Sequence, residues 1–437
     1  MRKSGNHISL TARRSSRLLA AGLMALAVLA PVKAQDFSRL SERTLMGTAR
    51  YVGMGGAMSA IGGDPSSVMD NVAGLGIYRR PEVTLTLDYA RFIMAPQSSI
   101  VFSLPTANPA GQGVQYHNFM FSYHRLHSFH ADYSATAEHQ PSLGALFIAA
   151  DGDLGIPFCA DRYSEANSMR LIEGGYVNEY ALDYAMNIAD RWYWGIGLHI
   201  HSFSMSSEAD YTETFGSGYY NRNKTTLLLN GAGCSLATGV IWRPASWLRF
   251  GFGLQTPSVG SVTTTTAGSF DAQTDSLRWN DIREQRSSAP DHHMPLQLST
   301  SVAFQISRYA MIAMQYNYRH ISSTPDVHSL RAGVEVVPFP GLYLNAGYAC
   351  ESPFRTSYPT VSIDPSLVRR DAYFSYPDRQ HYISCAIGYR GRYFIAQAAY
   401  QYQMKRTHLY AHENADAYLL DRNTHRIVLT VAWHRNN

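Results

Sequence analysis

The sequence predicts an all-β protein: a transmembrane antiparallel β-barrel of about 14 strands with an N-terminal segment that plugs its lumen. Residues 180–200 alternate large apolar residues with small or ionisable ones at period two, on both sides of a turn at Asp190-Arg191. Aromatic residues stand at both ends of the apolar face, as in strands that cross a membrane. After residue 34 no stretch approaches 18 consecutive apolar residues, so spanning segments must be strands of a closed barrel.

Residues 1–34 have the pattern of a secretory signal peptide that is cleaved before Gln35. Basic residues precede the apolar stretch 18–30, and the small-residue site 32–34 follows it. The stretch is about 13 residues long, too short for a spanning helix. Arg13-Arg14 leaves a twin-arginine signal as the alternative. Export and a barrel together predict the outer membrane of a Gram-negative cell.

The chain without residues 1–34 is close to neutral. That segment holds six of the 37 Lys and Arg and none of the 33 Asp and Glu, which leaves 31 basic against 33 acidic residues. A nucleic-acid partner therefore has no electrostatic basis. The four cysteines show no C-x-x-C spacing, which argues against a zinc site, and the sequence leaves open whether any pair is oxidised. They are Cys159, Cys234, Cys350 and Cys385.

The period-two pattern predicts fourteen strands joined by short and long connections in alternation. The predicted strands are 82–94, 114–125, 141–151, 177–189, 192–206, 223–242, 247–263, 280–306, 309–319, 327–337, 341–350, 379–390, 393–405 and 424–434. The predicted long loops are 95–113, 152–176, 207–222, 264–279, 320–326, 351–378 and 406–423. Short turns face the periplasm in outer-membrane barrels, so 190–191 and 126–140 are expected there. The lumen-facing candidates are Glu179, Asp183, His199, His201, Arg331 and Glu335.

Residues 35–80 show no alternation and are rich in glycine. The run 53–63 lacks the G-K-[ST] ending of a phosphate loop. This segment has no large apolar face of its own, so we expect it to pack as a compact element against the lumen wall. Its glycines include Gly53, Gly55, Gly56, Gly62 and Gly63.

Several motifs in this order resemble the FadL/TodX-type outer-membrane transport proteins, which carry long-chain fatty acids and other hydrophobic molecules, particularly members from Bacteroidetes. The matching segments are GTARYVGMGGA at 47–57, IGGDPSS at 61–67, NVAGL at 71–75, GVIWRP at 239–244, QTP at 255–257 and LRAGVE at 330–335. The resemblance implies that 35–80 is a hatch and 81–437 a barrel with long extracellular loops. The family's Asn-Pro-Ala signature corresponds to Asn71, Val72 and Ala73, followed by Gly74. Without the proline, the hatch turn is expected to be looser.

The resemblance further implies passive uptake of small hydrophobic molecules, fatty-acid-like or aromatic, gated by the hatch. The expected partners are membrane lipids, the hydrophobic substrate and the barrel-assembly machinery, and the expected state is a monomer without cofactor. The alternative function is a protein-secretion shuttle or a surface receptor, including haem binding at His199 and His201. No G-x-S-x-G elbow is present, which argues only mildly against a hydrolase because such barrels need not have one. We predict no enzyme, no catalytic residues and no metal site.

Overall fold

The computed structural model describes residues 42–91, 93–108, 111–143, 163–273, 278–291, 294–320, 326–353, 374–412 and 415–435. Every described residue belongs to one compact unit. The predicted signal peptide lies outside the described residues and stays a prediction. None of the described helices is long and apolar enough to cross a membrane.

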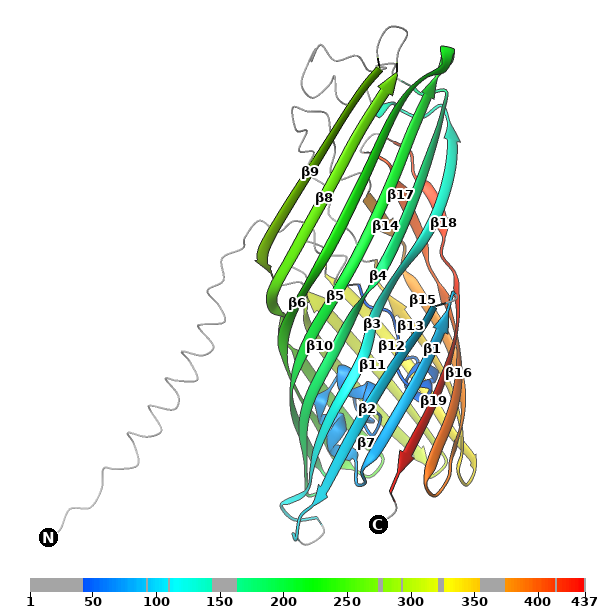
Figure 1. Cartoon of the computed structure of the whole chain (residues 1–437). Coiled ribbons are helices and arrows are strands. Elements are labelled where there is room, and N and C mark those ends of the chain that lie inside the picture. The colour runs from blue at the N-terminus through cyan, green and yellow to red at the C-terminus, as the bar shows by residue number, and fades with distance from the viewer. Residues whose placement is uncertain are drawn as a thin grey trace, which may run out of the picture. The chain divides into compact units, whose positions relative to one another are not determined.

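Sixteen strand segments form one antiparallel sheet that closes on itself through the pairing of β5 with β6 (Figure 1). The segments are β1 (Glu82–Ala90), β2 (Ile93–Pro105), β3 (Val114–Glu138), β4 (Ala166–Ile188), β5 (Trp192–Phe215), β6 (Tyr219–Ala245), β7 (Leu248–Gln255), β8 (Val259–Gln273), β9 (Arg278–Asp291), β10 (Leu296–Ser307), β11 (Ala310–His320), β12 (Val327–Phe339), β13 (Leu342–Glu351), β15 (Gln380–Arg390), β16 (Phe394–Met404) and β19 (Thr424–His434). A separate sheet contains β14 (Phe374–Pro377), β17 (Arg406–Tyr410) and β18 (Tyr418–Asp421).

The barrel has 14 strands, as predicted, because β7 and β8 form one wall strand and β9 and β10 another. Strand β6 pairs with β7 up to Ala237↔Gln255 and with β8 from Cys234↔Val259, so the pairing continues across a short break. We call the end with the short connections 189–191, 246–247, 308–309, 340–341 and 391–393 the turn end, and the opposite end the loop end. The last strand, β19, also finishes at the turn end.

The sequence prediction is wrong at residues 93–105, where it ends a strand at 94 and assigns a long outer loop to 95–113. Residues 93–105 form β2, which pairs with β1 from Ala90↔Ile93 to Glu82↔Val101. Pro96 and the polar run after it resemble a loop, but Gln97 and Ser99 are buried on the inward face. Polar residues are common on the inward face of a barrel wall, so this segment is compatible with a membrane-spanning strand.

Segment 126–140 is also corrected: it is not a periplasmic turn. Strand β3 continues to Glu138, and the register with β4 shifts between Arg125 and His127, as at a β-bulge. At a bulge the inward-facing and outward-facing positions of a strand are exchanged. The period-two pattern therefore breaks between Arg125 and His127, although the strand continues. The predicted strand 141–151 lies outside the described residues from 144 onward, and β3 pairs directly with β4, so no wall strand separates them. The missed strand β2 and the extra wall strand predicted at 141–151 offset each other. Residues 180–200 therefore still belong to the fourth and fifth strands of the wall.

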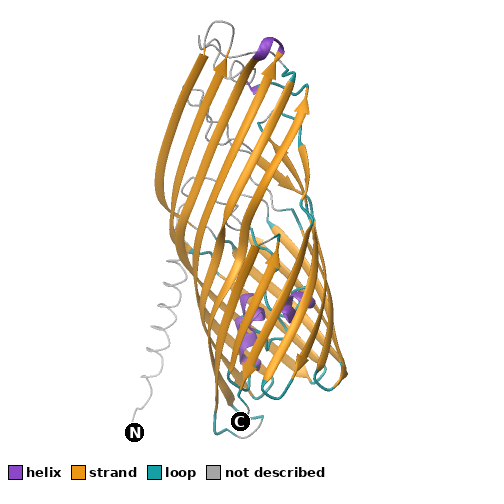
Figure 2. Cartoon of the chain, turned by 45° about the vertical axis from the view of Figure 1, so that its right-hand side comes forward, coloured by secondary structure: helices purple, strands orange, loops and turns teal. Residues whose placement is uncertain are grey.

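The predicted loops 207–222 and 264–279 are wrong for a common reason. Strands β5 and β6 extend to a hairpin at η4 (Gly216–Gly218), and β8 extends to Gln273. Likewise β4 begins at Ala166 within predicted loop 152–176, and β17 and β18 lie within 406–423. Figure 2 shows that the long strands rise well above the rest of the wall. Beyond the apolar band a strand no longer needs an apolar outward face, so the alternation fades.

Residues 42–80 form the hatch, which lies inside the barrel (Figure 2). It contains α2 (Ala49–Gly53) and the 3₁₀ turns η2 (Pro65–Met69) and η3 (Val72–Ile77). Each starts at a side chain that caps a backbone N–H: Thr48 accepts from Tyr51, Asp64 from Ser66 and Asn71 from Ala73. Short turns with local caps suit a glycine-rich segment that lacks an apolar face.

Candidate functional site

The Asp70 side chain accepts three hydrogen bonds from the barrel wall and a fourth from Tyr51 within the hatch. Its Oδ2 accepts from the hydroxyl of Tyr51 (2.6 Å), Nη1 of Arg331 (2.9 Å) and Nε2 of Gln315 (3.0 Å). Its Oδ1 accepts from Nε2 of Gln297 at 3.2 Å. The carboxylate is buried, so a charged and an aromatic donor compensate for its lost hydration.

A second anchor is the ion pair of Arg50 in α2 with Glu335 in β12. Nε donates to Oε2 at 2.6 Å and Nη2 to Oε1 at 2.8 Å, and Asn345 donates to the same carboxylate at 2.9 Å. Near this pair, burial raises the pKa of the Asp64 carboxyl, while the Arg50 charge acts in the opposite direction. Arg331 and Glu335, predicted to face the lumen, thus both hold the hatch.

Glycines of the wall let the hatch backbone approach within contact distance. A Cβ on Gly347 would lie 2.1 Å from N of Gly55, and a Cβ on Gly333 would lie 2.3 Å from O of Met54. On the other side of the hatch, a Cβ on Gly253 would lie 2.1 Å from the carbonyl oxygen of Asp70. Similar clashes arise at Gly195 and Gly239. The hatch therefore fits this wall only where side chains are missing.

The predicted hatch residues all lie in this packed element. Gly53, Gly55, Gly56 and Gly62 are buried and Gly63 is partly buried, and a Cβ on Gly53 would lie 2.4 Å from that of Ala386 in β15. Asn71 donates from Nδ2 to Ser59 O (3.0 Å) and Val240 O (3.3 Å), which ties the turn to β6. Val72, Ala73 and Gly74 follow inside η3, all buried. The predicted looseness of this turn stays a prediction.

The other lumen-facing candidates, on β4 and β5, form a buried polar cluster. His199 lies between two carboxylates, with Nε2 at 3.0 Å from Asp183 and Nδ1 at 3.2 Å from Glu179. His201 Nε2 contacts the Ser235 hydroxyl at 2.9 Å. Their side chains alternate with the exposed outward residues of β4 and β5 and are at most 1% exposed, so neighbouring side chains cover them. Within the described part of the chain, no group of three or more His, Cys, Asp or Glu is arranged to hold a metal.

Two buried apolar clusters are built from residues of the long strands together with residues of β17, β18 and the connecting segments. The first contains Leu126, Phe129, Val177, Phe203, Met205, Leu229, Val262 and Met294, and the hatch residue Met69 packs against it. The second contains Leu143, Met169, Leu171, Ala209, Tyr211, Phe270, Ala272, Leu409, Ala411, Ala415 and Tyr418. Apolar side chains on the inner face of a barrel wall contrast with the polar lumen of a porin.

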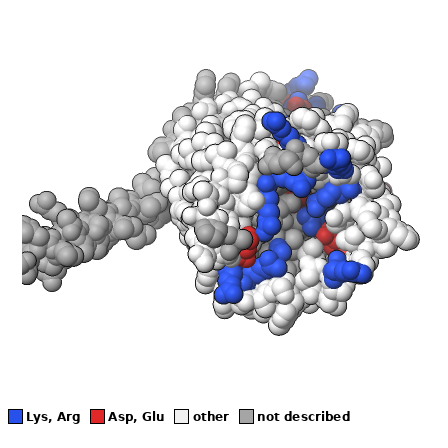
Figure 3. All heavy atoms as spheres, turned by 90° about the horizontal axis from the view of Figure 1, so that it is seen from below, with Lys and Arg blue, Asp and Glu red and all other residues white. Residues whose placement is uncertain are grey.

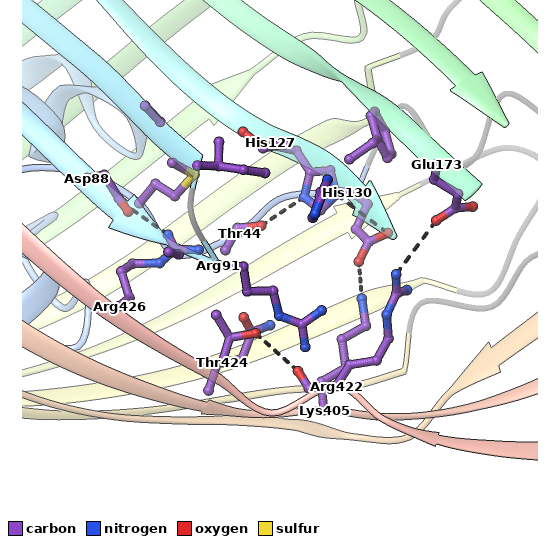
Figure 4. A pocket seen from close by; sticks show the side chains of 18 residues that line it. Thr44, Asp88, Arg91, His127, His130, Glu173, Lys405, Arg422, Thr424 and Arg426 are labelled. Atoms are coloured by element: carbon purple, nitrogen blue, oxygen red, sulfur yellow. Dashed lines mark hydrogen bonds and ion pairs between the residues drawn. The ribbon is translucent and has the colours of Figure 1, made fainter. Parts of the chain in front are cut away.

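A charged pocket of about 110 Å³ lies between the hatch entry, the β1–β2 hairpin, β3 and the segment that leads into β19 (Figure 4). Three of its cations are paired: Arg426 with Asp88 (3.2 Å), Arg422 with Glu173 (3.7 Å), and Lys405 with Glu42. Its fourth cation, Arg91, donates to neutral groups, the Tyr133 hydroxyl (3.3 Å) and Asn423 O (3.2 Å). The pocket thus has an excess positive charge that an anion can neutralise.

The same pocket lies where β2 and β3 diverge. The two strands pair from Pro105↔Tyr116 to Ser98↔Tyr123, and both continue beyond that point. Ile93 of β2 and His130 of β3 line the pocket from the two sides of this seam.

Basic side chains gather around the mouth of the barrel at the turn end, with few acidic ones between them (Figure 3). The exposed arginines here are Arg79, Arg80, Arg191, Arg308, Arg390 and Arg392. Asp190 is paired with Arg79 at 2.9 Å. This rim attracts anions through long-range electrostatics.

Sequence reasoning missed Asp70, Tyr51, Arg91 and the wall glycines. Gly251 and Gly253, or Gly195 and Gly197, stand at alternate positions of one strand face, which is the signal of a close backbone approach. Arg91 belongs to no sequence motif, because the residues that it contacts, Tyr133 and Asn423, are far away in sequence.

No protein-family model matches the sequence, and no curated protein matches it. Solved structures do. A FadL homologue of Pseudomonas aeruginosa superposes with a TM-score of 0.55 and 12% identity, over 90% of this chain and 99% of that one. The toluene transporter TodX of P. putida gives 0.54 and 13%, over 90% and 99%. The monoaromatic hydrocarbon channel CymD gives 0.53 and 10%, over 91% and 99%.

The closed wall and its internal hatch define the class of this protein as a plugged, 14-stranded transmembrane β-barrel. Its fold is that of the FadL/TodX-type outer-membrane channels, so the resemblance predicted from the sequence is confirmed at the level of fold.

Proposed function

We propose that this protein is a passive outer-membrane channel for small hydrophobic molecules, and that the hatch is its gate. The observation that carries the proposal is the apolar lining of the inner wall, because Phe203 and Leu229 lie on an inward face where a water-filled channel would have polar residues. Met69 continues this lining onto the hatch. Because outer-membrane barrels have their short turns in the periplasm, we assign the turn end to the periplasm, so the apolar path leads inward from outside.

The charged pocket favours a fatty-acid-like substrate over a bare hydrocarbon. An amphiphile with a carboxylate matches both features of the lumen: an apolar tail for the cluster at Phe129 and a negative charge for Arg91. Phe129 lines the pocket as well, so the two features are adjacent. The guanidinium is well suited to a carboxylate, because it binds both oxygens at once.

Gating requires the hatch to move relative to the wall, and a disulfide tests this directly. The hydroxyls of Ser59 in the hatch and Ser299 in β10 are 3.2 Å apart. The variant S59C/S299C, with the four native cysteines replaced by serine, should form a disulfide that ties the hatch to the wall. We expect oxidised protein in liposomes to lose uptake of a long-chain fatty acid and reductant to restore it.

The matched control is T86C/T430C. These hydroxyls are 2.9 Å apart on β1 and β19, which are already hydrogen-bonded neighbours, so this disulfide joins two wall strands. Because the Thr430 hydroxyl also accepts from the backbone N–H of Ala49 in the hatch, the oxidised control is compared with its own reduced form, and uptake should be equal in the two redox states. Undiminished uptake through oxidised S59C/S299C would refute gating by the hatch, and no uptake of any hydrophobic compound by the reduced protein would refute the channel itself.

A further inference from the structure

Three tyrosine–histidine pairs of the same geometry lie on the outward face of the barrel. In each, the tyrosine hydroxyl lies 2.6–2.7 Å from Nδ1 of a histidine on the neighbouring wall strand. The tyrosines are 38–44% exposed, so the pairs face the surroundings of the barrel. The pairs are Tyr316–His328 on β11 and β12, Tyr348–His381 on β13 and β15, and Tyr400–His425 on β16 and β19.

The three pairs stand at a common level of the wall. Each tyrosine is the seventh residue of a strand that starts at the turn end. Each histidine lies directly opposite the residue two positions after its tyrosine, nearer the loop end. Six adjacent strands, β11, β12, β13, β15, β16 and β19, thus carry a regular arc of imidazoles on the loop-end side of the apolar band.

The aromatic residues at the turn end differ in chemistry. Trp192 stacks on Trp242 with ring centroids 5.5 Å apart, and Phe394 and Trp433, which pair on β16 and β19, are exposed at the same end. Such residues anchor a barrel at any membrane–water interface. One tyrosine–histidine pair of the same geometry, Tyr184 with His117 (2.7 Å), lies near the turn end on β3 and β4. Because this pair lies near the opposite end of the barrel wall, it is a control for the position of a tyrosine–histidine pair along the wall.

Apolar grooves adjoin the pairs on the outward face. A groove of about 510 Å³ is lined by Met314, Tyr316, Leu330 and Tyr348 among others. A second, of about 460 Å³, is lined by Ile383, Ser384, Cys385, Tyr400, Tyr402 and His425. Each groove therefore contains at least one member of a pair in its lining, so that a hydrogen-bonding group borders an apolar surface.

The free face of each histidine suits a phosphate. When the tyrosine hydroxyl donates to Nδ1, a neutral imidazole carries its proton on Nε2, on the opposite side of the ring. That N–H can donate a hydrogen bond to a lipid headgroup. Phosphate oxygens accept such bonds, whereas acyl chains fit the grooves.

We propose that the arc of His328, His381 and His425 with its two grooves binds a phosphorylated, acylated glycolipid of the outer leaflet. The phosphates accept hydrogen bonds from the imidazoles, and the acyl chains lie in the grooves. The loop end faces outside because the short turns mark the periplasmic end, so the arc meets the outer leaflet. This inference does not depend on what passes through the lumen.

The test uses the full chain in phosphatidylcholine nanodiscs that contain diphosphoryl lipid A, and native mass spectrometry counts the lipid that stays bound. The variant H328F/H381F/H425F keeps the rings and removes the donors. We expect its lipid A binding to fall by about tenfold or more, as for lost hydrogen bonds to a charged group. H117F, which changes the turn-end pair, should bind like the unmodified protein.

A second measurement needs no variant. With the unmodified protein, dephosphorylated lipid A and phosphatidylglycerol should each compete poorly against diphosphoryl lipid A. Equal binding by the triple variant, or equal competition by the dephosphorylated lipid, overturns the phosphate contact. Equal competition by phosphatidylglycerol overturns the choice of a glycolipid.

Discussion

Arg50 in the hatch and Glu335 in β12 form a two-pronged ion pair, with contacts of 2.6 and 2.8 Å between side chains that are 10% and 3% exposed. The residues are far apart in sequence, so the pair forms only when the hatch is seated. Together with the contact between Asp70 and Arg331, it gives β12 two ion pairs with the hatch.

Removing one partner of this pair should unseat the hatch. Glu335→Gln leaves the Arg50 guanidinium buried without its carboxylate, at an expected cost of roughly 3–5 kcal/mol. We expect a clear rise in ion conductance across planar bilayers. Glu208→Gln is the control, because its ion pair with Lys224 is 42% exposed on both sides and contributes about 0–1 kcal/mol. Equal conductance of the two variants would contradict the anchoring role.

A methyl group added to a wall glycine should also weaken the packing of the hatch against the wall, without any change of charge. Gly347→Ala places a Cβ 2.1 Å from the backbone nitrogen of Gly55, so hatch or wall must shift, at a cost of about 1–3 kcal/mol. We expect faster proteolysis of the hatch. Gly216→Ala, whose nearest non-neighbouring atom is 4.0 Å away on Glu165, should be cleaved like the unmodified protein. An identical cleavage rate for Gly347→Ala would show that the wall yields instead.

The apolar lining can be tested on two consecutive residues of β6. Leu229 is 2% exposed in the inner cluster, whereas Leu228 is 39% exposed on the opposite face. Leu229→Gln puts an amide on the apolar path, with an unpaired-group cost of about 1–3 kcal/mol. Fatty-acid uptake into liposomes should fall by about tenfold and remain normal in Leu228→Gln. Equal uptake by both variants would argue against this path.

Arg91→Met distinguishes a carboxylate-binding pocket from a purely structural one. We expect uptake of a long-chain fatty acid to fall by about tenfold while uptake of a monoaromatic hydrocarbon stays constant, because the uncharged solute makes no use of the guanidinium. Arg170→Met removes an exposed arginine whose partner is Asp132, and should change neither. A parallel loss of both substrates would point to a structural role.

Mass spectrometry of protein extracted from membranes should find Gln35 as the first residue. The prediction follows from the small-residue site that ends at Ala34. A chain that still carries residues 1–34 would contradict it.

The sequence by itself determined the barrel and the lipid-facing side of those strands whose alternation is unbroken, because period-two alternation records a one-sided environment. For this reason the two strands predicted for the hairpin at 180–200 agree with β4 and β5 of the structure. The number of fourteen strands is correct because the missed β2 and the extra wall strand predicted at 141–151 offset each other. Where the environment is not one-sided the pattern fails, so β2, with Pro96 and Gln97, and the bulge at Arg125–His127 were missed.

Only the tertiary structure decided what the polar residues do. Glu179 and His199 are predicted to face the lumen, and neighbouring side chains cover them on the inward faces of β4 and β5, whereas Arg331 and Glu335 contact the hatch. Asp70 and Arg91 acquire their roles from partners far away in sequence, and each histidine of the outer arc acquires its role from a tyrosine on the neighbouring strand. Alternation along one strand carries no information about which strand lies beside it, so these contacts exist only once the barrel has closed.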